Sequence, residues 1–193
     1  MNSLKSTVFP EGSCPNDHEK EALLALWTLP KKVNRFDFLI QRGRRASHLY
    51  FIKKGTMRIY YVTNRTEVCV GFGYANTLIC SYPSFVQNQP SQYYIQALSD
   101  TELIGIPRQK FYDCLESSWN LEKHWRQMTE RALLGRIERE IDLVTHSPKE
   151  RLDRLLARSP HIFQLFAHKY IASYLRMTPE TLSRILGQKT TKS

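Results

Sequence analysis

Apolar and polar residues follow a helical pattern first and a strand pattern afterwards in the first 107 residues. Residues 22, 23, 26 and 27 are apolar and share one helical face, which predicts an amphipathic helix over 17–29 that Pro30 ends. From residue 34 onward, short apolar runs are separated by turn signals such as Gly55 and Asn64. The predicted strands cover residues 35–40, 49–53, 56–62, 67–72, 93–98 and 102–106. Closely spaced strands of this kind favour a sandwich or barrel, and we expect low order in residues 1–14 and 188–193.

Helical spacing returns after Pro107, with a short helix predicted over 108–116 and a much longer helix over 119–145. The long helix carries apolar residues at steps of three and four with one phase skip: Leu121, Trp125, Met128, Ala132, Leu134, Ile137, Ile141 and Val144. Such a stripe is buried either by the β domain alone or by the same helix of a second chain. In the second case the candidate dimer contacts are Trp125, Met128, Leu134, Ile137 and Ile141.

A new helix is predicted to begin after Ser147, because Ser147 and Glu150 have the spacing of a capping box. We expect this helix to continue to Arg158 and a hinge to lie over 145–147. These boundaries divide the chain into residues 1–116, 117–146 and 147–193.

The segment 167–186 has the apolar spacing of a DNA-binding helix-turn-helix. Ile171, Ala172 and Leu175 fall on one side of its first helix, and small Ala172 lets a second helix cross closely. Leu182 and Ile185 form the inward face of that second helix. An ordinary helical hairpin that ends an unrelated domain has similar spacing and is the alternative.

The second helix has an explicit start, because Thr178 can cap free N–H groups and Pro179 suits the first helical position. Residues 180, 181, 183 and 184 then point away from the inward face. An arginine suits a guanine and a carboxylate suits a cytosine amino group in the major groove. The candidate base contacts are Glu180, Ser183 and Arg184.

Charge strengthens the interpretation that the chain binds nucleic acid. The net charge of the 193 residues is +10, and residues 147–193 hold nine lysines and arginines against three acids, a net +6. Such a field suits phosphate neutralisation. Neither a membrane span nor a secretory signal is recognisable, so we expect a cytoplasmic protein.

The sequence offers no metal or catalytic cluster. Cys14, Cys69, Cys80 and Cys114 are too far apart for a zinc finger or a local iron–sulfur site, and we expect buried or idle thiols. His48 is the only histidine among the predicted strands, so a jelly-roll metalloenzyme lacks its ligands. We therefore predict that the chain is not an enzyme and carries no cofactor or metal.

The order of these segments resembles the Crp–Fnr family of bacterial transcription regulators. The helix-turn-helix carries the same resemblance in Tyr170-Ile-Ala-Ser-Tyr-Leu and Thr178-Pro-Glu-Thr-Leu-Ser-Arg-Ile185. The segment 48–60 and Lys149-Glu-Arg-Leu152 are similar to further parts of that family. The resemblance implies an α+β protein: an N-terminal β jelly-roll domain of the cyclic-nucleotide-binding type, a long dimerisation helix and a C-terminal winged-helix domain. It also implies a homodimer on an inverted-repeat DNA site, with RNA polymerase and a small-molecule effector as further candidate partners.

Carried over residue by residue, the resemblance gives Glu180 and Arg184 roles in base contacts, whereas Pro179 stands where some members have an arginine. Arg176 replaces the glycine usual in the turn, where a left-handed backbone is common. The candidate contacts to the DNA backbone are His168, Arg176, Thr178, Thr181 and Lys189.

The effector site departs further from the family. Its cyclic-nucleotide binders use a Gly-Glu pair and an arginine, but the corresponding stretch 73–85 has neither acid nor arginine, and no cation lies between Arg65 and Arg108. We predict that the chain does not bind cyclic AMP in the usual way. Aromatic residues here either pack in the core or line a pocket for an apolar ligand, with the candidates Tyr74, Tyr82, Phe85 and Tyr94. The alternative function is a sensor that signals through a protein partner after losing DNA binding, as Pro179 and Arg176 would suggest.

Overall fold

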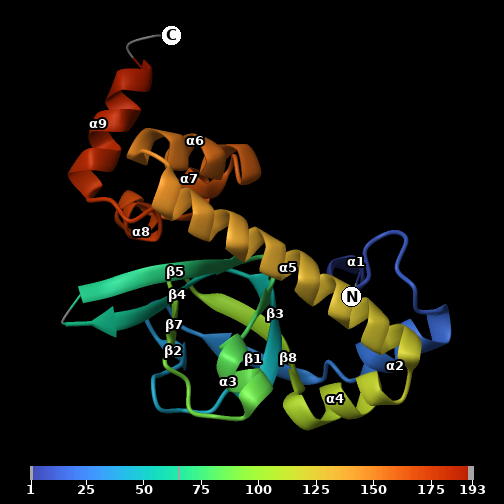
Figure 1. Cartoon of the computed structure of the whole chain (residues 1–193). Coiled ribbons are helices and arrows are strands. Elements are labelled where there is room, and N and C mark those ends of the chain that lie inside the picture. Colours follow the sequence, from blue (N-terminus) through green and yellow to red (C-terminus); the bar gives the residue numbers. More distant parts are fainter. Residues whose placement is uncertain (1, 65, 191–193) are drawn as a thin grey trace.

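The computed structural model describes residues 2–64 and 66–190, without the side chains of Lys189 and Thr190. Two antiparallel four-stranded sheets form the N-terminal domain (Figure 1). One sheet has the order β1 (Leu29–Val33), β8 (Thr101–Pro107), β3 (His48–Lys54), β6 (Leu78–Ile79). The other has the order β2 (Phe38–Ile40), β7 (Tyr94–Ala97), β4 (Thr56–Thr63), β5 (Thr66–Tyr74).

All six predicted strands are present, with ends that differ from the prediction by three residues or fewer. Strands β1 and β6 were not predicted. The predicted helix over 17–29 is too long: α2 (Asp17–Ala25) ends earlier because β1 pairs with β8 from Leu29 onward. Pro30 is tolerated there because β1 is an edge strand, which needs backbone donors on one side only.

The expectation of low order at the N-terminus is wrong for α1 (Asn2–Val8). Leu4 and Val8, one helical turn apart, are both buried. The buried ring of His124 stacks on Phe9 with centroids 5.2 Å apart, and His124 Nε2 lies 2.7 Å from the carbonyl oxygen of Val8. A helix this short is marginal by itself, so these tertiary contacts stabilise it.

The space between the sheets is filled by aliphatic side chains such as Ile52, Met57 and Ile95, each fully buried. Gly73 on β5 permits this packing, because a Cβ there would come within 2.8 Å of the side chains of Ile52 and Ile79. A second cluster lies beneath α1, α2, α3 (Tyr82–Gln87) and α4 (Arg108–Glu116).

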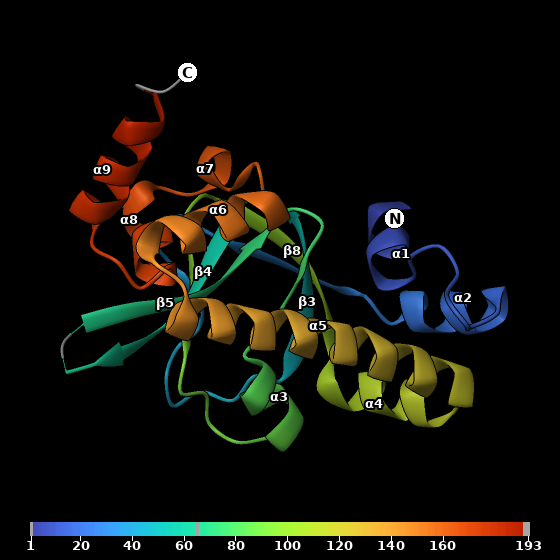
Figure 2. The same cartoon turned by 45° about the horizontal axis from the view of Figure 1, so that its top comes forward.

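Helix α5 (Trp119–Thr145) has the predicted bounds and begins at the Ser118 cap, whose hydroxyl accepts from the amide of Leu121. Its N-terminal half packs beside α4, and it then runs past β3 and β5 towards the C-terminal helices (Figure 2). No helix of the described residues is both long and apolar enough to cross a membrane.

In the described residues, four helices follow α5: α6 (Pro148–Arg158), α7 (Ile162–Leu165), α8 (His168–Tyr174) and α9 (Pro179–Thr190). The predicted capping box forms at the start of α6, where Ser147 and Glu150 exchange hydrogen bonds. The fold class is confirmed as an antiparallel β domain, a long helix and C-terminal helices. The described residues after Pro107 are free of strands, so the wing that the resemblance implies is not among them.

Candidate nucleic-acid interface

Helices α8 and α9 form the predicted helix-turn-helix around one apolar cluster. Ile171, Ala172 and Leu182 are completely buried. The amide of Met177 donates to the carbonyl of Ala172 at 3.0 Å, which closes the turn. Arg176 adopts φ 55°, the left-handed conformation expected at this position.

The start of α9 is fixed by Thr178. Its hydroxyl accepts a hydrogen bond from the amide of Thr181 at 3.2 Å, and the two threonine hydroxyls are also 3.2 Å apart. Thr178 therefore caps the helix, as its sequence position predicts. A role of either threonine at the DNA backbone stays a prediction.

The outward face of α9 carries the three candidate base contacts. Glu180, Ser183 and Arg184 are exposed, whereas Leu182 and Ile185 between them are buried. The backbone amide of Glu180 itself and the Thr178 hydroxyl hold the pKa of the Glu180 carboxyl below its usual value, so this group is charged near neutral pH. One anionic and one cationic side chain are thus presented together on a free helical face.

Further exposed polar and basic side chains lie on the neighbouring turn and on α8. Arg176 in the turn and His168 at the start of α8 are exposed, and the His168 ring meets Phe163 edge to face at 5.2 Å. Lys169 is exposed beside His168. It contributes to the net charge of residues 147–193 but was not among the candidate DNA contacts predicted from the sequence. The side chain of Lys189 lies outside the described residues.

Helix α8 is docked on strand β5 at a β-bulge. The register shifts between Ile59 and Tyr60, which leaves Val70 without an opposite residue. Next to it, the amide of Cys69 donates to the Ser173 hydroxyl of α8 at 3.0 Å, and the carbonyl of Val70 accepts from Arg136 Nη1 at 2.8 Å. The irregular strand thereby supplies hydrogen bonds to both α8 and α5.

Aromatic contacts extend this junction. The rings of Phe72 and Phe166 lie 4.2 Å apart, and Phe72 also contacts Tyr174 at 5.2 Å. The guanidinium of Arg58 lies between the rings of Tyr60 and Tyr170. The position of the helix-turn-helix relative to the β domain therefore rests on packed rings and on directed hydrogen bonds.

A buried aspartate joins α6 to the long helix. Asp142 Oδ2 accepts from Arg158 Nη2 at 2.6 Å, and Arg154 Nε donates to Oδ1 of the same carboxylate. Burial opposes the charge of Asp142, but the hydrogen bonds from Arg158 and Arg154 hold its pKa below the usual value. The sequence reasoning missed this group, since the partners are 12 and 16 residues away on another helix.

The structure separates the candidate dimer contacts into two groups. Trp125 packs inside its own chain, 4.8 Å from the ring of Phe111, and Met128 is half-buried. Leu134, Ile137 and Ile141 are exposed by 61%, 44% and 51%. The second group is free to contact another molecule, whereas Trp125 belongs to the core of its own chain.

The four candidate pocket residues do not share a pocket. Phe85 is buried in the core, and Tyr74 packs against His161 and Phe166 of the C-terminal helices. Tyr94 stacks on Tyr60 in the sheet, while Tyr82 is exposed near α5. The structure does not bring these four side chains together around one cavity, because Phe85 lies in the core and the other three contact different elements.

Polar groups of the stretch 73–85 are satisfied by the protein itself. The hydroxyls of Ser81 and Ser91 are 2.7 Å apart, and the Ser84 hydroxyl accepts from the amide of Ala46 at 2.9 Å. Arg108, the next cation, donates to the carbonyls of Phe85 and Val86. The Ser81 and Ser84 hydroxyls and part of the Arg108 guanidinium are therefore already engaged within the protein.

The described residues hold no group of three or more histidine, cysteine or acidic side chains arranged for a metal ion. Cys14 is exposed and Cys69 is buried, and burial raises the pKa of the Cys69 thiol to about 11. Cys14 is therefore not a buried thiol.

Comparison with known proteins agrees with this architecture. Residues 30–118 match the cyclic nucleotide-binding domain family. The fumarate and nitrate reduction regulatory protein of Escherichia coli K12 is 28% identical over 189 residues, which cover 90% of this chain and 73% of that protein. FixK2 from Bradyrhizobium japonicum has a similar structure, with a TM-score of 0.75, 16% identity and coverage of 84% of each chain. The catabolite activator protein of Thermus thermophilus gives a TM-score of 0.59 at 17% identity, covering 97% of this chain and 88% of that one.

Proposed function

We propose that the chain is a Crp–Fnr-type regulator that binds specific DNA as a homodimer. Its match to the cyclic nucleotide-binding domain family and its 28% identity to a fumarate and nitrate reduction regulatory protein support this proposal. The observation that carries this proposal is the outward face of α9, where Glu180, Ser183 and Arg184 are exposed above a buried inward face. Such a face can read base edges in a major groove. DNA as a partner also supports a cytoplasmic location.

The exposed part of α5 supports the homodimer. Leu134, Ile137, Ile141 and Val144 recur at steps of three, four and three residues, the spacing of a coiled-coil seam. All four are exposed in the single chain, Val144 by 81%. A symmetric pair of these helices would bury the seam, and a two-fold dimer suits an inverted-repeat site.

Regulation by cyclic AMP is not part of the proposal. The stretch 73–85 lacks a cation, and its serines bond to neighbouring protein groups. A cyclic phosphate would therefore lose its water shell without gaining a charged partner. Calorimetry with cyclic AMP should detect no micromolar binding.

Selection of bound DNA from a random pool with the purified protein tests the main proposal. We expect enrichment of an inverted repeat, and loss of that preference in Arg184→Ala while non-specific binding persists. Lys53→Ala is the matched control, because Lys53 is an exposed cation on β3, away from α9. Failure to enrich any sequence would contradict the proposal and favour the sensor that acts through a protein partner.

A further inference from the structure

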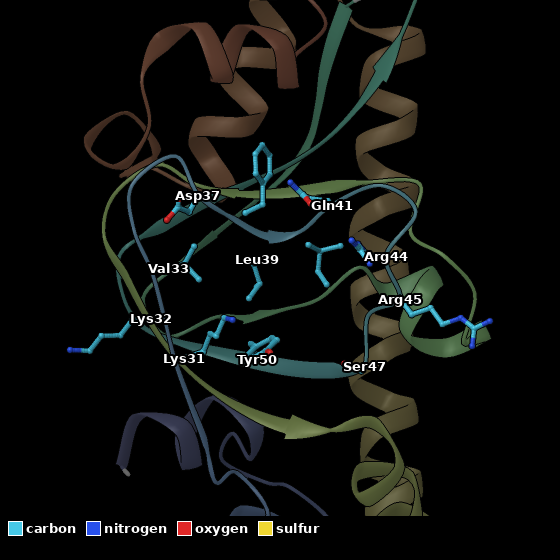
Figure 3. Close-up of a pocket in the computed structure, with 12 residues that line it drawn as sticks. Lys31, Lys32, Val33, Asp37, Leu39, Gln41, Arg44, Arg45, Ser47 and Tyr50 are labelled. Atoms are coloured by element: carbon cyan, nitrogen blue, oxygen red, sulfur yellow. The ribbon is translucent and has the colours of Figure 1, made fainter.

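A cavity of about 580 Å³ opens between strands β1 and β2 (Figure 3). These strands are the outer edges of the two sheets and follow each other in the chain, so the sheets are open towards solvent here. The walls come from β1, β2, the loop between them, the loop that precedes β3, and Tyr50. No residue of the stretch 73–85 lines this cavity.

The cavity is strongly cationic. Four basic residues line it, and Asp37 is the single acid among the lining residues. Lys31 and Arg44 are directed towards the cavity, whereas Lys32 and Arg45 extend outward from its rim (Figure 3). In the described part of the chain no ion pair engages these cations, while the Asp37 carboxylate accepts from Asn34 Nδ2 at 3.1 Å. The positive charge is therefore available to a ligand.

The lining of the cavity is mostly polar, but apolar side chains form part of its floor. Val33 and Tyr50 are buried, and Leu39 is half-buried beside them. The Tyr50 ring lies directly on Gly105 of β8, where an added Cβ would meet the ring at 2.7 Å. Burial raises the pKa of Tyr50, so its hydroxyl keeps its proton and can act as a donor.

The two loops beside the cavity are held by hydrogen bonds to the rest of the domain. Phe36 in the β1–β2 loop has φ 72°, a strained conformation for a bulky residue. Its amide donates to the carbonyl of Ala97 and its own carbonyl accepts from Gln96 Nε2, both at 2.9 Å. On the other wall, the amide of Ser91 donates to the carbonyl of Arg44 at 2.9 Å.

We propose that this cavity binds a small organic anion, with a phosphate or carboxylate group attached to an apolar or aromatic body. Lys31 and Arg44 would bind the anionic group, and Val33, Leu39 and Tyr50 would contact the body. The volume lies within the range of about 300–1,000 Å³ that is usual for small-molecule sites. A concave cavity with a buried apolar floor favours a small ligand over an extended acidic segment of another protein. The proposal concerns binding alone and does not depend on the DNA-binding function.

Calorimetry with 1-naphthyl phosphate and 1-naphthoate tests the proposal, with inorganic phosphate and uncharged 1-naphthalenemethanol as reference compounds. We expect at least one naphthyl anion to bind at least about tenfold more tightly than either reference, because only the anions have both the charge and the body. The tighter of the two identifies the preferred anionic group. Equal binding of the uncharged compound would overturn the proposal, since it would indicate non-specific adsorption to exposed apolar surface.

The double variant Lys31→Gln/Arg44→Gln should weaken binding of the preferred anion at least about tenfold. The control Arg42→Gln/Lys53→Gln removes the same charge from exposed positions that do not line the cavity, and it should bind like the original chain. Circular dichroism and thermal unfolding confirm that both variants fold. Equal weakening in the two variants would overturn the proposal in favour of general charge attraction. Equally tight binding of a polyglutamate peptide that requires Lys31 and Arg44 would instead identify a protein docking surface.

Discussion

The guanidinium of Arg58 on β4 lies 4.8 Å from the ring centre of Tyr170 on α8. The same guanidinium contacts the Tyr60 ring at 4.0 Å and the Glu67 carboxylate at 2.6 Å, so its place in the β domain is fixed. Tyr170 therefore meets a cation that is already positioned. This pair is one of the contacts that determine where the helix-turn-helix lies.

Replacing Tyr170 with alanine should loosen the C-terminal helices. Loss of a cation–π contact costs about 0.5–2 kcal/mol. We expect faster hydrogen exchange of α8 amides, measured by mass spectrometry. Tyr170→Phe keeps the ring and should exchange like the original chain; acceleration in both variants would attribute the effect to the hydroxyl instead.

Ser173→Ala removes the acceptor of the Cys69 amide at the bulge. The change should lower the free energy of unfolding by about 1–2 kcal/mol, because a buried N–H loses its partner. Urea titration measures this effect. Ser183→Ala, on the exposed face of α9, should change stability by less than about 0.5 kcal/mol. Equal losses in the two variants would contradict a special role for Ser173.

Asp142→Asn should lower the free energy of unfolding at pH 7 by about 1–3 kcal/mol, since two arginines lose their anionic partner but remain partly solvated. The pKa of Asp142 is lower in the folded chain than in the unfolded chain. Its stabilising contribution is therefore complete above the unfolded pKa of about 4 and is lost as the pH falls through the lower folded pKa. Urea titrations of both proteins should give a stability difference that shrinks below about pH 4. A difference that stays constant with pH would rule out the ion pair as its cause.

Ile137→Glu should convert the proposed dimer to a monomer, because paired helices would place two carboxylates in the apolar seam. Sedimentation analysis measures the change, and specific DNA affinity should fall with it. Gly135→Glu adds the same charge at an exposed position of α5 outside the apolar stripe and should stay dimeric. A monomeric original chain would contradict the homodimer directly.

Arg176→Gly should act in opposite directions on stability and on DNA binding. Glycine tolerates φ 55° without a Cβ clash, so the free energy of unfolding should rise by about 0.5–1 kcal/mol. If Arg176 contacts a phosphate, the slope of log affinity against log salt should fall by about 1. An unchanged slope would remove Arg176 from the DNA backbone contacts.

Local signals explain why the starts of α6 and α9 were predictable. Ser147 and Glu150 form the capping box expected from their spacing, and α6 has the predicted bounds. Thr178 caps α9 in the same way, which places Glu180, Ser183 and Arg184 outward as predicted. These features depend on neighbours within one helical turn.

Features that depend on distant partners were missed. Strand β1 contains Pro30, and only its edge position beside β8 makes that acceptable. Pairing of Cys69 with Ser173 depends on a register shift and on the docking of a helix about 100 residues later. The cationic cavity likewise joins Lys31 and Arg44, which no local spacing relates to each other.

One turn of α5 has a mechanical consequence. Ile141 is exposed by 51% on the proposed seam, while the adjacent Asp142 is buried against the arginines of α6. Successive residues of a helix point about 100° apart, so the two side chains are rigidly linked through the backbone. In a dimer, a rotation of α5 at the seam would therefore also move α6. The two α9 helices would then change their separation together.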